Sequence, residues 1–252
     1  MRLFLTLLLL CTLVVPAPVR AGDLATLRVA VPERQPYFFR VQGEPAGLEA
    51  DLLSELAESL QLALVFVPCD TDQCLEMVEE GRADLGAGVA EVPGLSGRLL
   101  FVRPAYALRS NTVFYRLRET APVRDQRRLR GKKLGVRRNA PLPPEIASDH
   151  LIPRIEQNSA ARLIKLLLAG AVDLVMLEEA EGDSVLRSLH LERRITKCQY
   201  RLPGGEPLFF AFSLHSKQLS RAGQLENQLR DMVDSGRLKG LQQLYLNNEE
   251  TP

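Results

Sequence analysis

The segment from Gly81 to Arg98 is the part of this sequence best suited to holding a small molecule. It reads GRADLGAGVAEVPGLSGR, and an amphipathic run precedes it while a short apolar run follows it. We predict that a helix ends at Gly81, that a buried strand starts at Ala83 and that a loop of small residues opens at Gly88. Small residues at a strand end let the backbone approach a ligand. A tight strand-to-helix turn is the alternative interpretation.

The residue types that most often perform catalysis do not form a recognisable pattern. The three histidines, His150, His190 and His215, are scattered and lack metal-ligand spacing. No serine lies in a nucleophile-elbow motif. We therefore expect a binding protein without a cofactor or a metal rather than an enzyme, although catalytic residues need not be adjacent in sequence.

The first 21 residues have the pattern of a cleavable export signal. Arg2 supplies a positive charge, and the apolar run from Leu3 to Val15 is shorter than the roughly 20 residues that span a bilayer. Val-Arg-Ala ends this segment with small residues, so we predict cleavage after Ala21 and a periplasmic location. Cys11 suggests a lipoprotein as an alternative, but a leucine precedes it where a lipobox needs a small residue.

An exported chain folds in an oxidising compartment, and this bears on its cysteines. Cys69 and Cys74 flank a short Asp-Thr-Asp-Gln run between a predicted strand and a predicted helix. We predict a disulfide that fixes the start of the helix. Metal binding is the alternative, but two further ligands are missing nearby. Cys198 lies in a strand-like run and is predicted to be a buried free thiol.

Strand and helix patterns alternate along the chain. Leu48, Leu52, Leu56 and Leu60 fall at intervals of four and predict a helix with one apolar stripe facing a sheet. Short apolar runs precede and follow this helix, which is typical of a parallel sheet with right-handed crossovers. The fold class is therefore α/β.

The motif Gly-x-x-Asp-Leu occurs at Gly81 and again at Gly170, each time between a helical run and an apolar run. Two copies indicate two similar α/β lobes. Two long strand-like runs, 106–116 and 208–214, are predicted to cross between the lobes as hinge strands. A ligand cleft is expected between the two lobes. The predicted division is a signal peptide at 1–21, a first lobe at 22–108 plus 212–252, and a second lobe at 109–211.

Composition and charge exclude some classes of partner. The chain has 252 residues, of which 46% are hydrophobic and 25% charged, and its formal net charge is +1. These values are ordinary for a globular protein and give no reason to expect nucleic-acid binding. A basic cluster at 127–133 is interpreted as a solvated edge.

Eight segments, in their order and spacing, resemble the bacterial extracellular solute-binding proteins of family 3, the periplasmic amino-acid-binding components of ABC transporters. They are LRVAV from 27, QPY from 35, GLEAD from 47, GRADL from 81, FVRPAY from 101, LRGKKLGV from 129, GAVD from 170 and GRL from 236 with Tyr245. The resemblance spans residues 27–246. It implies the two-lobed periplasmic binding protein fold, which closes around a small polar ligand by hinge motion.

The resemblance also implies ligand contacts from both lobes. The matching positions are Arg34, Tyr37, Gly88, Val89 and Ala90 in the first lobe and Asn139 and Glu178 in the second. Arg34 stands where the family often has a stacking aromatic residue, and Glu178 stands where an acid accepts the ligand's ammonium group. Plain core packing for Tyr37 and a solvated strand end for Glu178 are the alternatives.

Leu95 occupies the position at which the family usually has an arginine that binds the ligand's α-carboxylate. An alkyl side chain cannot donate these hydrogen bonds, and nearby Arg98 could replace them only from a shifted loop. Such an interaction contributes about 1.5–3 kcal/mol. The resemblance thus implies a cleft short of positive charge, whose ligand is an amine rather than a standard amino acid in the usual pose.

The function expected from these observations is capture of a small polar molecule, amino-acid-like or an amine, by a monomer that serves an inner-membrane ABC permease. One alternative is an enzyme similar to cyclohexadienyl dehydratases, with Glu178 or Glu91 as general acid. The missing cation argues against its dicarboxylic substrates. The other alternative is a sensory module that reports the ligand to a membrane partner, because fold alone does not choose among these functions.

Overall fold

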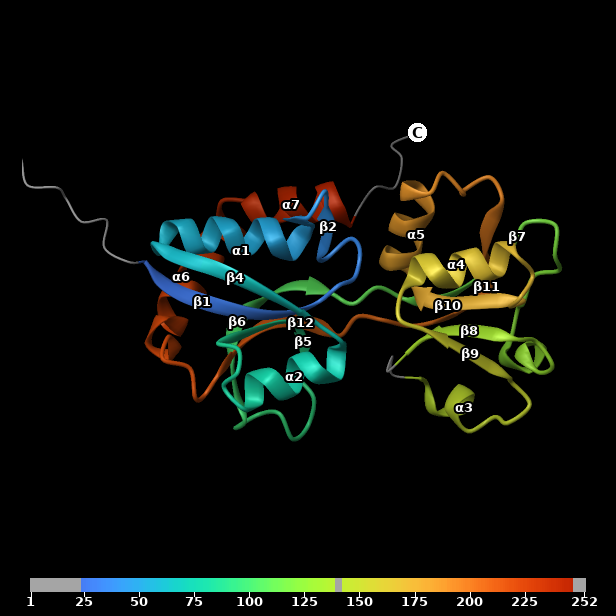
Figure 1. Cartoon of the computed structure of the whole chain (residues 1–252), viewed down its shortest axis with the longest axis horizontal. Coiled ribbons are helices and arrows are strands. Elements are labelled where there is room, and N and C mark those ends of the chain that lie inside the picture. Colours follow the sequence, from blue (N-terminus) through green and yellow to red (C-terminus); the bar gives the residue numbers. More distant parts are fainter. Residues whose placement is uncertain (1–23, 139–141, 247–252) are drawn as a thin grey trace, which may run out of the picture.

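The computed structural model describes residues 24–138 and 142–246, and Figure 1 shows them as two α/β lobes side by side. Each lobe has its own five-stranded sheet. The predicted signal peptide at 1–21 lies outside the described residues. Among the helices of the described ranges, none has the length and apolarity to cross a membrane.

The sheet of the first lobe combines strands from both ends of the chain. In spatial order its strands are β4 (Leu62–Cys69), β1 (Ala25–Pro32), β5 (Leu85–Ala90), β12 (Pro207–Ser213) and β6 (Leu99–Leu108). β1 runs parallel to β4 and β5, as the alternating pattern predicts. β12 runs antiparallel to both β5 and β6, and so completes the sheet between them.

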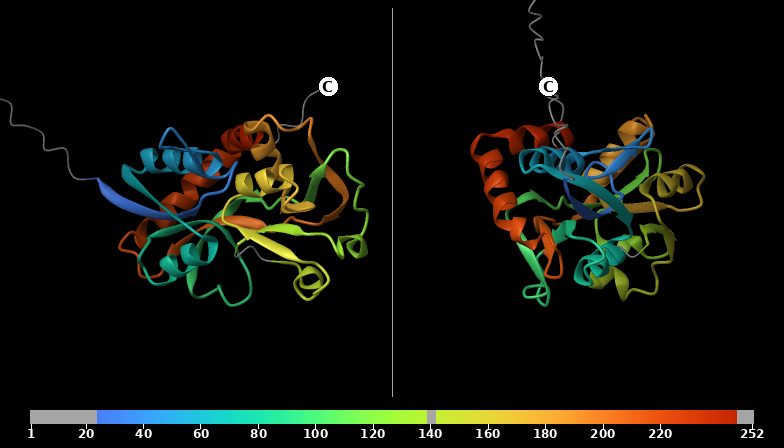
Figure 2. Two further views of the ribbon diagram at one scale, coloured as in Figure 1. Left: turned by 45° about the vertical axis from the view of Figure 1, so that its right-hand side comes forward. Right: turned by 60° about the vertical axis from the view of Figure 1, so that its left-hand side comes forward.

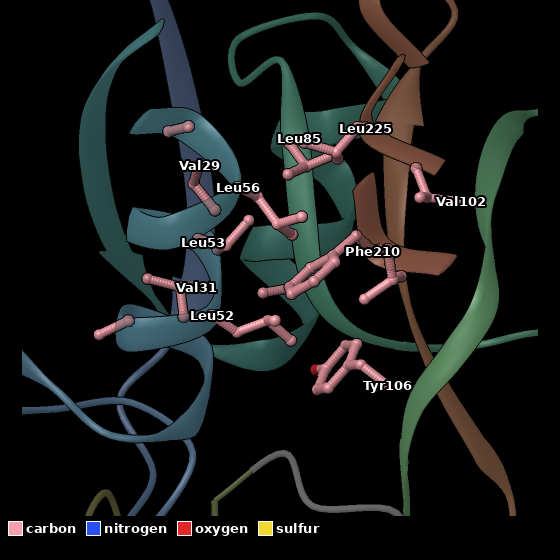
Figure 3. Packing of buried hydrophobic residues seen from close by; sticks show 14 of the residues in the cluster. Val29, Val31, Leu52, Leu53, Leu56, Leu85, Val102, Tyr106, Phe210 and Leu225 are labelled. Atoms are coloured by element: carbon pink, nitrogen blue, oxygen red, sulfur yellow. The ribbon is translucent and has the colours of Figure 1, made fainter. Parts of the chain in front are cut away.

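Helices cover both faces of this sheet. α1 (Leu48–Ser59), α6 (Ala222–Asp234) and α7 (Arg237–Tyr245) share one apolar core with the sheet, and α2 (Thr71–Glu79) packs on the other face. The predicted stripe of α1 is buried at Leu48, Leu52 and Leu56. Figure 3 shows Leu52, Leu53 and Leu56 beside Val29 and Val31 of β1. This burial fixes α1, and with it the loop that precedes α1, against the sheet. The remaining elements of this lobe are β2 (Phe39–Val41), β3 (Glu44–Ala46) and the 3-10 turn η2 (Leu219–Arg221).

The sheet of the second lobe is built from the middle of the chain. Its strands are, in spatial order, β11 (Ile195–Leu202), β7 (Thr112–Leu117), β10 (Leu174–Glu178), β8 (Leu134–Arg137) and β9 (Arg154–Gln157). α4 (Ala160–Leu168) and α5 (Glu179–Ser188) pack on one face, while the 3-10 turn η1 (Gln126–Leu129) and α3 (Pro144–Ala147) pack on the other.

The two lobes are joined by two short crossings that lie against each other (Figure 2). The chain leaves the first sheet after Leu108 and returns to it at Pro207. The Arg109 N–H donates to the Glu206 carbonyl, and the Gly205 N–H donates to the Arg109 carbonyl, both at 2.8 Å. The crossings are therefore a bonded hinge of a few residues each.

The structure corrects the predicted position of the return crossing. The sequence-based division places residues 207–211 in the second lobe, but β12 begins at Pro207 and pairs with β5 and β6 of the first sheet. The run 106–116 likewise divides into the end of β6 and most of β7, so it is not one continuous strand. Apolar alternation marks both sides of each crossing equally, and this is why it cannot locate the crossing point.

The cysteines are placed as predicted. Cys69 at the end of β4 and Cys74 in α2 form a disulfide, with Cα atoms 5.3 Å apart. Cys198 in β11 is a buried free thiol. Within the part of the chain that the structure describes, no group of three His, Cys, Asp or Glu side chains could hold a metal ion.

Candidate functional site

The candidate site lies between the lobes, where the loop after β1 meets the carboxyl end of β10. Arg34 of this loop donates from Nη1 to Oε1 of Glu178 at 2.5 Å. Arg109 of the first crossing donates from Nη1 to the same oxygen at 2.9 Å. Glu178 is the last residue of β10, at the strand end where open α/β sheets bind ligands. One carboxylate oxygen thus links the first lobe, the second lobe and the hinge.

The Tyr37 ring lies against the Arg34 guanidinium. The guanidinium carbon of Arg34 lies 4.6 Å from the centre of the Tyr37 ring, within the range of a cation–π interaction. The Tyr37 side chain is buried, and its hydroxyl has no hydrogen-bond partner. The second carboxylate oxygen of Glu178, Oε2, is also buried without a partner. Two polar atoms between the lobes are therefore buried without a partner, and a ligand that bonds to them would remove the cost of leaving them unpaired.

A second layer of polar groups supports this cluster from the first lobe. The Tyr106 hydroxyl donates to Glu49 Oε1 at 2.5 Å and accepts the Gly88 N–H at 2.8 Å. Gly88 has a φ of +71°, and a Cβ at this position would lie 3.3 Å from Glu49 Oε1. The small-residue strand end predicted from the sequence is thus needed for the backbone to approach Glu49 and Tyr106.

A second buried ion pair lies where the two lobes meet. Arg137, at the carboxyl end of β8, donates to Glu181 of α5 at 2.6 Å, and both side chains are largely buried. The same guanidinium lies 3.5 Å from the Glu33 carbonyl of the first lobe. Arg137 therefore makes a second, weaker contact between the lobes.

Burial changes the titration of several of these groups. It raises the pKa of Glu49, against the opposing effects of the Tyr106 hydrogen bond and of Arg34. It also raises the pKa of Glu181, which Arg137 opposes. Burial alone would lower the pKa of Arg34, but the combined attraction of Glu178, Tyr37, Glu181 and Glu49 outweighs it and raises that pKa, so the guanidinium stays charged.

The raised pKa of Glu49 predicts a pH dependence of stability. An acid whose pKa is higher in the folded state stabilises the fold fully below its unfolded pKa, here about 4.5, and this contribution is lost as the pH rises through the folded pKa. The free energy of unfolding of the wild type, relative to Glu49→Gln, should therefore fall as the pH rises above about 4.5. Urea unfolding of both proteins across this range measures the difference. A difference that does not change with pH would contradict the prediction.

The structure brings together four of the residues predicted to bind the ligand: Arg34, Tyr37, Gly88 and Glu178. Val89 and Ala90 continue β5 beyond Gly88 and pair with Phe209 and Leu208 of β12. Asn139 lies outside the described residues. These placements fit a binding site at the end of β5.

Arg98 and Leu95 lie in the loop before β6, away from this cluster. Arg98 is exposed and pairs with Glu79 of α2. Leu95 is buried, in one apolar cluster with Phe101 and Phe209. The loop thus buries its leucine in the core beside α2.

The predicted shortage of positive charge in the cleft is not found. Arg34 and Arg109 contact Glu178, and Arg137 lies in the same interface. Sequence reasoning missed Arg109, Arg137 and the partners Glu49, Tyr106 and Glu181. The position of Arg137 at the carboxyl end of a strand was a usable signal. Arg109 had no such signal, because its role depends on where the first crossing leaves the sheet.

Comparisons with known proteins agree with this architecture. The model of the bacterial extracellular solute-binding proteins, family 3, matches residues 27–248. A Campylobacter jejuni protein described as a probable histidine-binding protein is 22% identical over 201 residues, which are 79% of this chain and 76% of the relative.

Two solved structures show the same fold. An ancestral arginine-binding protein bound to arginine has a TM-score of 0.74 at 19% identity, over 88% of this chain and 98% of its own. A histidine kinase sensor domain with similarity to periplasmic binding proteins has a TM-score of 0.69 at 19% identity, over 87% of this chain and 96% of its own. Because the family model spans nearly all of the described residues, this chain belongs to the bacterial extracellular solute-binding proteins of family 3.

Proposed function

We propose that this protein is an exported, non-enzymatic receptor that binds a small amino-acid-like zwitterion between its lobes and presents it to the permease of an ABC-type importer. Membership of the family supports the role of receptor. The relatives described as binding histidine or arginine support a small ligand with a carboxylate and an amine. The ligand class rests further on the geometry at Glu178.

The observation that carries the proposal is the arrangement around the two oxygens of Glu178. Oε1 accepts from Arg34 and Arg109, which come from different elements, while Oε2 is buried without a donor. Each guanidinium has further N–H groups, so a ligand carboxylate beside them can take the place of the contact that Leu95 cannot make. The ligand's ammonium group would then donate to Oε2.

The balance of charge also favours a ligand with a carboxylate over a simple amine. Arg34, Arg109 and Arg137 lie among three buried acids, Glu49, Glu178 and Glu181, and Arg109 also pairs with the exposed Glu206 at 3.8 Å. Glu49 accepts a hydrogen bond from the Tyr106 hydroxyl, and burial raises its pKa, which lowers its negative charge. An amine without a carboxylate would meet a cluster that already holds its own cations. This changes the expectation of an amine ligand that the leucine at position 95 suggested.

The enzyme alternative gains no specific support from the site. Glu178, the first candidate for a general acid, is an acceptor of two arginine hydrogen bonds. Glu91, the second candidate, pairs with Arg103 in an exposed position. The kinase sensor domain among the structural neighbours is compatible with the sensory alternative, which differs from the proposal only in the protein that binds the loaded receptor.

Isothermal titration with matched compounds tests the ligand class. Each amino acid is compared with its decarboxylated amine and with its deaminated acid. We expect at least one zwitterion to bind about tenfold or more tightly than both analogues, because each analogue loses one charged contact of about 1.5–3 kcal/mol. Arg109→Gln should weaken the zwitterion by about tenfold or more. Arg103→Gln, which removes an exposed arginine of the first lobe, is the matched control.

Two results would contradict the proposal. One is an amine that binds as tightly as its parent amino acid, since this would make the arginines irrelevant to the ligand. The other is an Arg109→Gln variant whose affinity equals that of Arg103→Gln. Pull-down of the permease by the loaded protein, compared with pull-down of a sensor kinase, separates the two possible partners.

A further inference from the structure

The Arg34 side chain is surrounded as a bound guanidinium ligand would be. The Tyr37 ring lies against one face of the guanidinium at 4.6 Å, and the Glu178 carboxylate accepts from its end at 2.5 Å. The side chain is only 15% exposed, although it belongs to a loop. An aromatic face together with a carboxylate in the plane of the cation is a general arrangement for recognising guanidinium groups.

This arrangement connects the two lobes through side chains of the protein itself. Arg34 and Tyr37 belong to the loop of the first lobe, and Glu178 belongs to the second lobe. A hinged binding protein is shifted to its closed form by whatever binds that form better, and this is normally a ligand that touches both lobes. Here a side chain of the protein itself touches both.

We propose that Tyr37 and Glu178 form a binding site for guanidinium and amidinium groups, that Arg34 fills this site in the free protein, and that the lobes therefore close without solute. The tether makes Arg34 a strong competitor, because a group linked by a short loop acts at an effective concentration of about millimolar or more. Free guanidinium compounds should consequently bind only when Arg34 is removed. This inference goes beyond the proposed function, because it concerns the protein without its transported ligand.

Small-angle X-ray scattering of solute-free protein tests the inference. Bound solute is removed by unfolding and refolding in urea, which avoids guanidinium salts. The wild type should have the smaller radius of gyration of a closed form, and Arg34→Ala the larger one of an open form. Methylguanidinium chloride should close Arg34→Ala again and raise its Tm by about 3 °C. Methylammonium chloride at the same concentration should do neither.

The controls separate this effect from a general loss of charge or of folding. Arg40→Ala removes an arginine whose ion pair and hydrogen bond stay within the first lobe, so this variant should remain closed. Arg34→Lys keeps the charge without the planar group, so it should be partly open and close on adding methylguanidinium. A wild type as open as Arg34→Ala would overturn the inference, and so would a response of both Arg34 variants to methylammonium equal to that to methylguanidinium.

Failure of this inference can be distinguished from failure of the proposed function. If no amino acid binds the wild type but methylguanidinium closes Arg34→Ala, the inference that Arg34 occupies a guanidinium site is supported. The proposed class of transported ligand is then wrong. If the wild type binds a zwitterion but is open without it, the inference that Arg34 closes the lobes is refuted. The proposed receptor function is then still supported.

Discussion

Replacing Gly182 with alanine is expected to destabilise the second lobe by about 3 kcal/mol. Gly182 lies in α5, directly over the ring of Tyr115 in β7. A Cβ at Gly182 would come closer than 3.0 Å to three atoms of Tyr115, a separation that real Cβ atoms essentially never show. Tyr115 is fully buried, and its hydroxyl donates to Asp183 at 2.8 Å, so the ring has little freedom to move aside. Either the helix shifts or the ring loses this bond.

Gly223→Ala in α6 is the matched control, since a Cβ there meets no atom within 4 Å. Alanine favours the helix over glycine by about 1 kcal/mol, so this variant should be as stable as the wild type or more stable. Urea unfolding followed by circular dichroism measures both variants. Equal stability of Gly182→Ala and the wild type would mean that the contact between α5 and β7 is looser than the structure shows.

Tyr106→Phe is expected to lower the free energy of unfolding by about 2–3 kcal/mol. The substitution removes only the hydroxyl, which donates to Glu49 and accepts the Gly88 N–H. The ring stacks on Phe210 with centroids 4.3 Å apart and should stay in place (Figure 3). The buried Glu49 carboxyl is left without its partner, and an unpaired buried polar group costs more than the lost hydrogen bond itself.

Tyr245→Phe provides the comparison for this prediction. The Tyr245 hydroxyl also donates to a carboxylate, Asp51, but this pair is partly exposed. Water can replace the lost partner there, so the loss should be about 1 kcal/mol or less. If the two variants lose equal stability in urea unfolding, the burial of Glu49 is not what makes the Tyr106 hydroxyl important.

Local sequence patterns predicted most of the architecture. The leucine stripe of α1, the disulfide between Cys69 and Cys74 and the division into two α/β lobes follow from periodicity, cysteine spacing and the repeated Gly-x-x-Asp-Leu motif. These features depend on neighbours in sequence, and a few nearby residues are enough to indicate each of them. The small-residue strand end at Gly88 belongs to the same class, because a backbone that approaches other groups closely needs a residue without a Cβ.

The contacts between the lobes could not be predicted in this way. Arg34 and Glu178 are 144 positions apart, and Arg109 and Glu178 are 69 apart. Their convergence depends on how the crossings orient the two sheets, and no local pattern records that orientation. Leu95 illustrates the same limit of sequence-based prediction. The absence of an arginine at position 95 was visible in the sequence, whereas the arginines that meet between the lobes were not.

The position of β12 has a consequence for the order in which the protein can assemble. β12 fills the gap between β5 and β6, yet ribosomes produce it only after the entire second lobe. The second lobe is contiguous, so its sheet can form as soon as Leu202 is available. Until Ser213 has emerged, the three strands β4, β1 and β5 are not joined to β6, so completion of the first sheet must wait for the final fifth of the polypeptide.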